Sequence, residues 1–441
     1  MSASFWRAGC WLLAALAGAP ANAAPAEFNV RAFHAAGDGM ALDTPALQGA
    51  LDACAAAGGG RVVLPPGTYL SGTLHLRDNV ELHLDQGARL LGTTNLAGYE
   101  PFAGVRESPR VPRDNWHRGL ILGEGVTNLT LSGPGVIDGQ NVFDPRGEEH
   151  MRGPHLILLA HCQNVNLRDL TLQHAGNYAL LYFHSDQVSV ANVTFLGGSD
   201  GVHFRGTPEH WNQGLSLTHC RFFTGDDGIA GHYLAGARIT DCTINSSCNG
   251  IRVIGPVRDF EVGGCEFFGP GKYEHRVSHR TNMLAAICLQ PGAWTPAPGF
   301  TDDVRLHDLT MKAVTTPLHV SLRPGGTAGR LRIEHLRATG VYRAPLSVES
   351  WGEPTFEDVA LRDVQVEFTG GGTTADAALA IRKPGADARP LPVWGLYLRG
   401  VKHLALDHVT LTTLAPDARP PFVAEDVGRL EQQATRFAAA P

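Results

Sequence analysis

Two adjacent acids, Asp226 and Asp227, lie between glycines in the segment GDDGIAG (residues 225–231). Adjacent side chains of a regular strand point to opposite faces, so these two carboxylates converge only where the backbone bends. Two carboxylates held close together cannot both ionise freely near neutral pH, and the one that keeps its proton can serve as an acid. The segment therefore predicts acid/base chemistry. A solvated turn is the alternative, because glycine and aspartate are common turn residues.

An eight-residue pattern recurs along the chain, with mostly apolar residues at positions 1, 3, 6 and 8 and usually Asp, Asn or His at position 5. Its copies start 22 to 28 residues apart, apart from two steps of 44 and 45 residues. They begin at Val165, Val188, Leu215, Ala237, Phe260, Val304, Leu331, Val359 and Leu404. A second strand-like segment precedes many of them, and short strands at such a period without helical periodicity are typical of a solenoid. We therefore predict an all-β protein built as a parallel β-helix, in which the polar position 5 is the bend between two strands.

Both ends of a solenoid need a cover, because an open strand edge invites aggregation. The segment DTPALQGALDACAAAGGG (residues 43–60) predicts a capping helix, with Asp43 or Thr44 as N-cap, Pro45 in the first turn and three glycines after its end. We expect an N-terminal cap over about residues 25–75. At the other end, residues of about 415–441, which include GRLEQQATRF, are expected to close the last coil.

The first 24 residues combine an early basic residue, Arg7, with a short apolar stretch and the small-residue sequence Ala21-Asn22-Ala23. This is typical of a secretory signal peptide, and the stretch is too short for a membrane span. We expect cleavage near Ala23, export to the periplasm or the medium, and no membrane association afterwards. Residues 25–441 are then a single β-helix catalytic domain, expected to be a monomer.

Composition excludes several other classes of function. The chain of 441 residues carries a net charge of −7, only 18% of its residues are charged, and it has no block of lysine and arginine, so neither nucleic acid nor an anionic membrane is an expected partner. No nicotinamide, flavin or phosphate-binding motif is evident, so no cofactor is predicted. Cys220, Cys242 and Cys265 recur at intervals of 22 and 23 residues, which is the repeat length, and are interpreted as stacked core thiols rather than a metal site.

The register of the repeats brings distant acids together. Aligning the segments by their first inward residue places Val202, Ile229 and Ile251 on one interior line. The residues two places before each are Asp200, Asp227 and Asn249. Because neighbouring strands of a sheet lie about 4.8 Å apart, Asp200 and Asp227 should be close neighbours with Asp226 beside them. Three carboxylates at one place cost stability, and this favours a catalytic site over a plain turn.

The outward positions around these acids carry polar side chains and an occasional aromatic ring, as in a groove that binds a sugar chain. A proton donor and a carboxylate that activates water are the minimum for hydrolysis of a glycosidic bond. For each flanking residue a solvated surface role is the alternative. The expected substrate-binding residues are His203, Arg205, His232, Asn249, Arg252, Gln290, His319 and Glu349, with Arg323 and Trp351 just beyond them.

These segments resemble glycoside hydrolase family 28, the polygalacturonase and rhamnogalacturonase group of right-handed parallel β-helices. The similarity runs from FNVRAFHAAGDG (residues 28–39) to about residue 370, through RVVLPPGTYLSGTLHLRDNVELHLDQGARLLG and LSGPGVIDGQ. GSDG stands where the family has Asn-Thr-Asp-Gly, and GDDGIA stands on its Asp-Asp motif. The resemblance implies Asp226 as general acid, Asp200 and Asp227 as the residues that activate water, and inversion of the anomeric configuration.

The chain departs from the family at two motifs. Asn249, in CNG, stands where the family has the histidine of Gly-His-Gly, and CLQ (residues 288–290) stands where it has the Arg-Ile-Lys that holds a uronate carboxylate. Either Arg252, Arg205 or Arg280 supplies the missing cation, or the substrate is a neutral or differently linked sugar.

Two other functions fit the same solenoid. One is a polysaccharide lyase or epimerase, in which the acids bind Ca²⁺ and a nearby Arg or His abstracts a proton next to a uronate carboxylate. The other is a carbohydrate-binding solenoid without catalysis, since a fold does not fix a function. Insertions at residues 269–282 and 291–300 are expected to wall off one end of the groove, which would favour action at chain ends.

Overall fold

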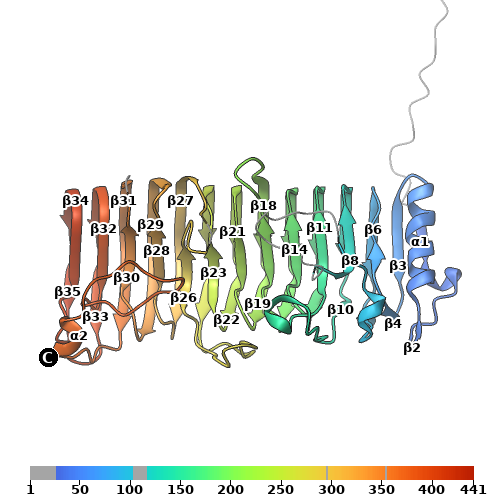
Figure 1. Cartoon of the computed structure of the whole chain (residues 1–441), viewed down its shortest axis with the longest axis horizontal. Coiled ribbons are helices and arrows are strands. Elements are labelled where there is room, and N and C mark those ends of the chain that lie inside the picture. The colour runs from blue at the N-terminus through green and yellow to red at the C-terminus, as the bar shows by residue number, and fades with distance from the viewer. Residues whose placement is uncertain (1–25, 103–116, 295, 353–354) are drawn as a thin grey trace, which may run out of the picture.

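The computed structural model describes residues 26–102, 117–294, 296–352 and 355–441, and these form one long parallel β-helix (Figure 1). The expected signal peptide, residues 1–24, lies outside the described residues. Each coil contributes strands to three parallel sheets, and every strand pairs with its counterpart in the next coil. This confirms the fold predicted from the repeats. In the described residues no helix is both long and apolar enough to cross a bilayer.

The first sheet carries the candidate site on its outer face. Its strands, in order, are β5 (Leu74–His75), β8 (Gly119–Glu124), β11 (His155–Ala160), β14 (Leu180–Phe183), β17 (Val202–Arg205), β20 (Ile229–His232), β23 (Asn249–Val253), β26 (Ala285–Leu289), β28 (Leu318–Leu322), β30 (Leu346–Ser350) and β32 (Leu396–Asp407).

The other two sheets complete each coil. The second contains β1 (Glu27–Asn29), β3 (Gly60–Leu64), β6 (Val80–Leu84), β9 (Thr127–Ser132), β12 (Gln163–Arg168), β15 (Asp186–Ala191), β18 (Asn212–Thr218), β21 (Leu234–Thr240), β24 (Val257–Gly263), β27 (Gly299–Lys312), β29 (Gly326–Val341), β31 (Phe356–Phe368) and β34 (Phe422–Gln433). The third contains β2 (Asp38–Leu42), β4 (Gly67–Ser71), β7 (Ala88–Gly92), β10 (Val136–Asp138), β13 (Thr171–Gln173), β16 (Thr194–Leu196), β19 (Arg221–Thr224), β22 (Thr243–Ser246), β25 (Glu266–Phe268), β33 (Thr410–Thr413) and β35 (Arg436–Ala438). The long strands β27, β29 and β31 run through the corner between the second and third sheets, and β32 and β34 run from the first sheet into the second.

The interior is a stack of apolar rows, because alternate residues of each strand point inward. Val202 pairs with Ile229, which pairs with Ile251, as the repeat register predicts. The rings of Phe195 and Phe222 stack in the same way, with centroids 4.5 Å apart. The three periodic cysteines are free, buried and part of this core, as predicted.

The polar residue at position 5 of the repeat is the bend between two strands, as predicted. Asp169, Asn192, Asp241 and His335 all have φ between 51° and 66°. Aspartate, asparagine and histidine enter this left-handed region more readily than other side chains, which explains why they recur there.

Helix α1 (Thr44–Ala56) covers the first coil, at the blue end of Figure 1. It buries Leu47, Leu51 and Cys54 against that coil, and it ends before the glycines as predicted. The N-cap differs from the expectation in one respect. The Asp43 carboxylate makes no cap hydrogen bond but accepts from the backbone N–H groups of Ala36 and Gly37, at 2.6 Å and 2.9 Å.

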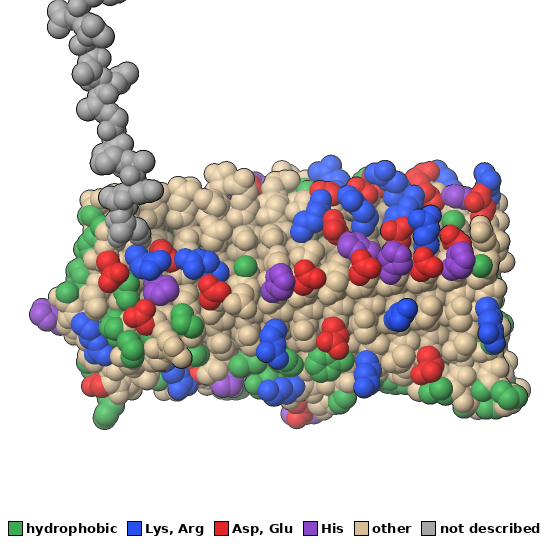
Figure 2. Space-filling view, turned by 180° about the vertical axis from the view of Figure 1, so that it is seen from behind, with side chains coloured by type: hydrophobic (Ala, Val, Ile, Leu, Met, Phe, Trp, Pro, Cys, Tyr) green, Lys and Arg blue, Asp and Glu red, His purple; other side chains and the backbone are tan. Residues whose placement is uncertain are grey.

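The C-terminal end shows no separate cap within the described residues. The residues expected to close it instead form β34 and β35, which continue the coils, and the outer residues of β34 are largely exposed. A short helix, α2 (Thr374–Ala377), and three short 3-10 helices, η1 (Val30–Phe33), η2 (Leu96–Gly98) and η3 (Glu148–His150), lie in the connections. The rear of the molecule carries rows of acidic, basic and histidine side chains over its C-terminal half (Figure 2).

Candidate active site

The acids lie at the turns that lead into two successive strands of the first sheet, Asp200 before β17 and both Asp226 and Asp227 before β20. Asp200 and Asp227 are each followed by a glycine, and a Cβ on Gly201 or Gly228 would lie 2.6 Å from a carbonyl oxygen of the next coil, that of Gly228 or Gly250. The Asp-Gly and Asn-Gly pairs therefore let the coils approach closely where the polar side chains emerge. Asp226 and Asp227 both lie in the bend between β19 and β20, which answers how two adjacent acids reach one site.

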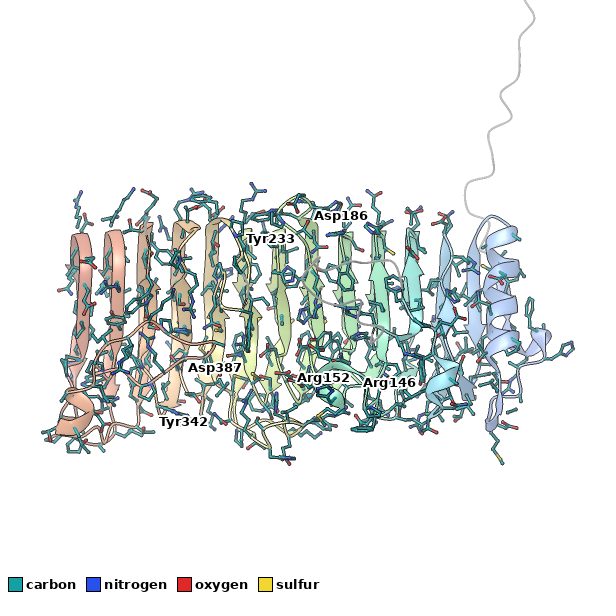
Figure 3. The ribbon with its side chains drawn as sticks, in the orientation of Figure 1. Arg146, Arg152, Asp186, Tyr233, Tyr342 and Asp387 are labelled. Atoms are coloured by element: carbon teal, nitrogen blue, oxygen red, sulfur yellow. The ribbon has the colours of Figure 1, made fainter. Side chains whose placement is uncertain are left out.

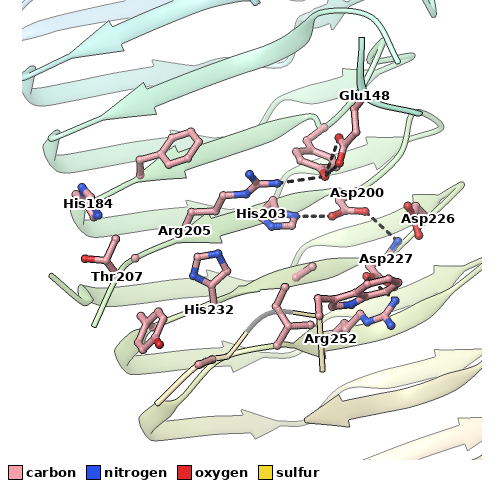
Figure 4. Close-up of a pocket in the computed structure, with 18 of the residues that line it drawn as sticks. Glu148, His184, Asp200, His203, Arg205, Thr207, Asp226, Asp227, His232 and Arg252 are labelled. Carbon is pink, nitrogen blue, oxygen red and sulfur yellow. Dashed lines mark hydrogen bonds and ion pairs between the residues drawn. The ribbon is translucent and has the colours of Figure 1, made fainter. Parts of the chain in front are cut away.

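A cavity of about 660 Å³ opens beside these acids (Figure 4). Its volume falls in the range of roughly 300–1,000 Å³ that is usual for small-molecule sites. The side chains on its wall come from β14, β17, β20 and β23 and from the loops at residues 148–152, 207–208 and 294–297. The polar and aromatic residues among them are Glu148, Glu149, Arg152, Tyr178, Phe183, His184, Asp200, His203, Arg205, Thr207, Asp226, Asp227, His232, Tyr233, Arg252 and Trp294.

Asp226 is held as an anion. Arg152, which precedes β11, donates to its carboxylate at 2.7 Å, and the Nε2 atom of His275 lies 3.5 Å from the other oxygen. Backbone N–H groups of Val277 and Ser278 point at Nδ1 of His275, which leaves the Nε2 proton for Asp226. Burial alone would raise the pKa of Asp226, but His275 and Arg152 hold it well below its usual value.

The surroundings of Asp200 favour its protonated form. Burial raises its pKa well above the usual value, and the neighbouring charges of Asp226 and Asp227 raise it further. Its Oδ2 atom lies 2.6 Å from Nδ1 of His203, whose pKa burial lowers to about 4. A protonated carboxyl beside a neutral imidazole donates to Nδ1 and leaves the imidazole proton on Nε2. That Nε2 atom is buried and has no hydrogen-bond partner among the described residues.

Asp227 lies between these two acids and is fixed from behind. Its backbone N–H donates to Asp200 at 3.2 Å, and its Oδ1 atom accepts from both the backbone and the amide of Asn249, each at 2.9 Å. Arg252 approaches the other oxygen at 3.8 Å. Burial raises the pKa of Asp227, although Arg252 opposes this shift.

An aromatic wall closes the other side of the acids. The ring of Tyr178 stacks on His203 with centroids 4.6 Å apart, and its hydroxyl donates to Glu148 at 3.1 Å. Arg205 lies beyond them and reaches the same hydroxyl at 3.5 Å. Trp294 stands over the guanidinium of Arg252, 5.3 Å from its ring centroid. Such flat apolar surfaces next to hydrogen-bonding groups suit a sugar ring.

The predicted site residues fall into two groups. The cavity brings together Asp200, Asp226 and Asp227 with four of the predicted binding residues: His203, Arg205, His232 and Arg252. The other four predicted binding residues do not line it. Asn249 is buried behind Asp227, while Gln290, His319 and Glu349 are also buried, and Glu349 pairs with Arg389 from a later segment of the chain. The expectation that all eight face an open groove is therefore corrected for these four.

Sequence reasoning missed several residues of the site. Arg152 and Glu149 come from the connection between β10 and β11, where the run of charges in GEEHMR (residues 147–152) was the available signal. His275 comes from the insertion at residues 269–282, for which the sequence predicts only a wall of the groove. The second insertion supplies Trp294, as expected of a wall of the groove.

The cluster is poorly suited to a divalent cation. Oxygen atoms of Asp226 and Asp227 and the sulfur of Cys248 lie within 4.8 Å of one another. The sulfur, however, already accepts from Arg280 at 2.9 Å, and Arg152 and Arg252 are paired with the two acids. A metal ion at this place would have to displace these cations.

Comparisons with known proteins connect this geometry to a family. Residues 27–252 match the family described as rhamnogalacturonase A/epimerase, pectate lyase-like. The chain is 27% identical over 260 residues to the exo-poly-alpha-D-galacturonosidase of Dickeya chrysanthemi, a match that covers 47% of this chain and 42% of that protein. It therefore spans less than half the length of that relative. A stretch of 64 residues, 13% of this chain and 7% of the relative, is 50% identical to the mannuronan C5-epimerase AlgE6 of Azotobacter vinelandii.

The fold has relatives among solved structures. A hyperthermoactive exopolygalacturonase from Thermotoga maritima superposes with a TM-score of 0.63, over 88% of this chain and 93% of that chain. The two sequences are 17% identical, so the likeness concerns the fold.

Proposed function

Because the chain belongs to the rhamnogalacturonase A/epimerase, pectate lyase-like family, we propose that it is a glycoside hydrolase that cleaves a pectic or related plant cell-wall carbohydrate. The observation that carries this proposal is the unequal surroundings of three carboxyls in one cavity. Arg152 pairs with Asp226 and lowers its pKa, whereas burial and the neighbouring acids raise the pKa of Asp200. Two acids whose environments push their pKa values apart are what acid/base hydrolysis requires.

In this mechanism Asp200 donates its proton to the glycosidic oxygen as the bond to the anomeric carbon breaks. Asp226 accepts a proton from the water that attacks the opposite face of the sugar, and the new hemiacetal has inverted configuration. The proton that Asp226 takes from the water passes to solvent, and Asp200 regains one from solvent after each cycle. His203, 2.6 Å from Asp200, holds this carboxyl in place. Trp294, which is largely exposed at the wall of the cavity, offers a flat face for a sugar ring.

This assignment exchanges the roles that the family resemblance implies, in which Asp226 is the acid. The physical reason is Arg152, which forms a 2.7 Å ion pair with Asp226 and opposes its protonation. Asp227, bonded to Asn249 and to Asp200 through its backbone, orients the other two acids.

The proposal is tested on a panel of pectic and neutral plant oligosaccharides with the intact protein and with Asp226→Asn. We expect release of reducing sugar by the wild type, loss of release in the variant with binding retained, and an inverted first-formed anomer in the NMR spectrum. Binding without turnover of any glycan by the wild type would indicate the non-catalytic alternative instead.

A lyase or epimerase acting on a uronate is the second candidate, and one observation favours it. Tyr178, whose ring stacks on His203, lies against the guanidinium groups of Arg152 and Arg205, cations that could neutralise a uronate carboxylate during proton abstraction. This function would yield unsaturated sugars or a changed C5 configuration in place of new reducing ends. In its calcium-dependent version a chelator would abolish turnover.

We also propose that the protein acts after export, to the periplasm or the medium. Support comes from the signal-like sequence of residues 1–24, which ends in Ala21-Asn22-Ala23. N-terminal sequencing of the exported protein tests this, with a new terminus near Ala24 as the expected result.

A further inference from the structure

A long connection crosses the outer face of the first sheet. Residues 378–395, between α2 and β32, run back from the last coils toward the middle of the helix (Figure 1), and we call this segment the strap. Its far point reaches the candidate active site. Arg252 donates from one nitrogen to the carbonyl of Ala386 at 2.6 Å and to Asp387 at 3.2 Å, and Figure 3 shows Asp387 over the central coils.

The strap is firmly attached. Arg389 forms two hydrogen bonds with the fully buried Glu349, both at 2.8 Å, and the indole N–H of Trp351 donates to the same carboxylate at 2.7 Å. Arg323 donates to the carbonyl of Gly385 at 2.7 Å. A paired arginine fork of this kind is among the strongest polar contacts in proteins, so the strap is held over the sheet rather than loose.

Beneath the strap lies a row of polar groups without partners. Gln290 is fully buried, and neither its amide oxygen nor its amide nitrogen has a hydrogen-bond partner in the described part of the chain. The same holds for Nε2 of His319 and the hydroxyl of Ser321. A buried polar group without a partner lowers the stability of a protein, so the fold alone gives no reason to keep these four.

The outer face on the opposite side of the cavity is different. There the outward residues Leu122, Leu158 and Leu181 form a buried apolar cluster with Phe183. Outward positions on this sheet can therefore be filled with apolar side chains where they are buried. The polar row under the strap instead carries an amide, an imidazole and a hydroxyl, groups that bind the hydroxyls of a sugar.

The cavity ends where the strap begins. Its wall extends along the sheet from β14 to Arg252 on β23 and does not include the outward residues of β26 or β28. The outward rows nevertheless continue in register, since Arg252 pairs with Cys288, which pairs with His319. The polar row is thus the continuation of the cavity wall, covered by the strap.

We propose that the strap closes one end of a sugar-binding groove, so that the protein cuts next to a chain end and not within a chain. The cleavage in this inference rests on the proposed function as a glycoside hydrolase. The covered row of Gln290, His319 and Ser321 is the part of the groove that a longer chain would occupy if the strap were absent.

The test compares the wild type with a variant in which residues 382–388 are replaced by a shorter Gly-Ser linker that leaves Arg389 on Glu349. Affinity for short and long oligogalacturonides of defined length is measured by calorimetry, and product sizes are measured on polymer. The wild type should gain no affinity with length and release short products of one size. The shortened variant should gain affinity with length and release mixed sizes.

Asp387→Ala, which removes one of the two contacts between Arg252 and the strap, is a milder second variant that should shift both readouts in the same direction. Arg382→Ala, an exposed side chain on the same strap, is the matched control and should change neither. The strap proposal is overturned if affinity depends on oligosaccharide length equally in the wild type and in both strap variants. It is also overturned if the wild type releases products of mixed sizes at the earliest time. If affinity depends on oligosaccharide length as expected but no turnover is detected, only the proposal that the protein is a hydrolase is refuted.

Discussion

The guanidinium of Arg152 lies 2.7 Å from the carboxylate of Asp226 and joins two segments 74 residues apart in the sequence. Figure 3 shows Arg152 beside the middle coils, in the connection that precedes β11. The contact fixes the protonation of one catalytic candidate, because a buried arginine favours the charged form of its partner. The division of protons among the three acids therefore depends on a residue outside the repeat.

Replacement of Arg152 should move the pH dependence of activity. In Arg152→Gln the pKa of Asp226 rises, so the base is protonated at a higher pH and the acid limb of kcat/KM shifts upward by about 1–3 pH units. The matched control is Arg146→Gln, an exposed arginine of the same connection with 74% of its side chain accessible, which should leave the limb in place. A lower rate with an unmoved acid limb would mean that Arg152 is only structural.

The glycine after Asp227 should not tolerate a side chain. In Gly228→Ala the new Cβ would lie 2.6 Å from the carbonyl oxygen of Gly250 and force the coils apart under the acids. We expect a loss of about 1–3 kcal/mol in the free energy of unfolding and a fall in kcat, measured by denaturant titration and by kinetics. Gly385→Ala, where no atom lies within 4 Å, is the control and should be neutral. Equal effects at both glycines would contradict the close stacking.

Buried His319 should make the protein sensitive to acid. Burial lowers its pKa from 6.5 to about 4, so between these values the unfolded chain binds more protons than the folded one. The stability linked to this group is present above pH 6.5 and is lost as the pH falls through 4, roughly 3 kcal/mol in all. His319→Leu should flatten this part of the pH dependence of unfolding, whereas His335→Leu, at an exposed position, should not. Parallel curves for His319→Leu and the wild type would contradict the prediction.

The repeat explains why much of the fold and part of the site could be predicted. Residues one repeat apart in the sequence pair in neighbouring coils, so the inward residues could be aligned with one another: Val202, Ile229 and Ile251. The residues two places before them could be aligned in the same way: Asp200, Asp227 and Asn249. The polar bends were predictable for the same reason, because aspartate, asparagine and histidine tolerate a positive φ.

The rest of the site comes from segments without a period. Arg152, His275 and the strap belong to connections of irregular length, and only the folded chain shows that they return to the acids. Gln290 was aligned correctly as an outward residue, but the sequence holds no sign that residues 378–395 cover it. The acid/base roles could not be ordered either, because they depend on which acid Arg152 contacts.

The most direct measurement is the dependence of rate on the leaving group in Asp200→Asn and Asp226→Asn. The kcat/KM of each variant is determined on a natural oligosaccharide and on an aryl glycoside whose phenol leaves without protonation. If Asp200 is the acid and Asp226 the base, Asp200→Asn loses about 10²–10⁴-fold on the oligosaccharide but little on the aryl glycoside, while Asp226→Asn loses activity on both. The opposite pattern, with only Asp226→Asn rescued by the good leaving group, would contradict the account.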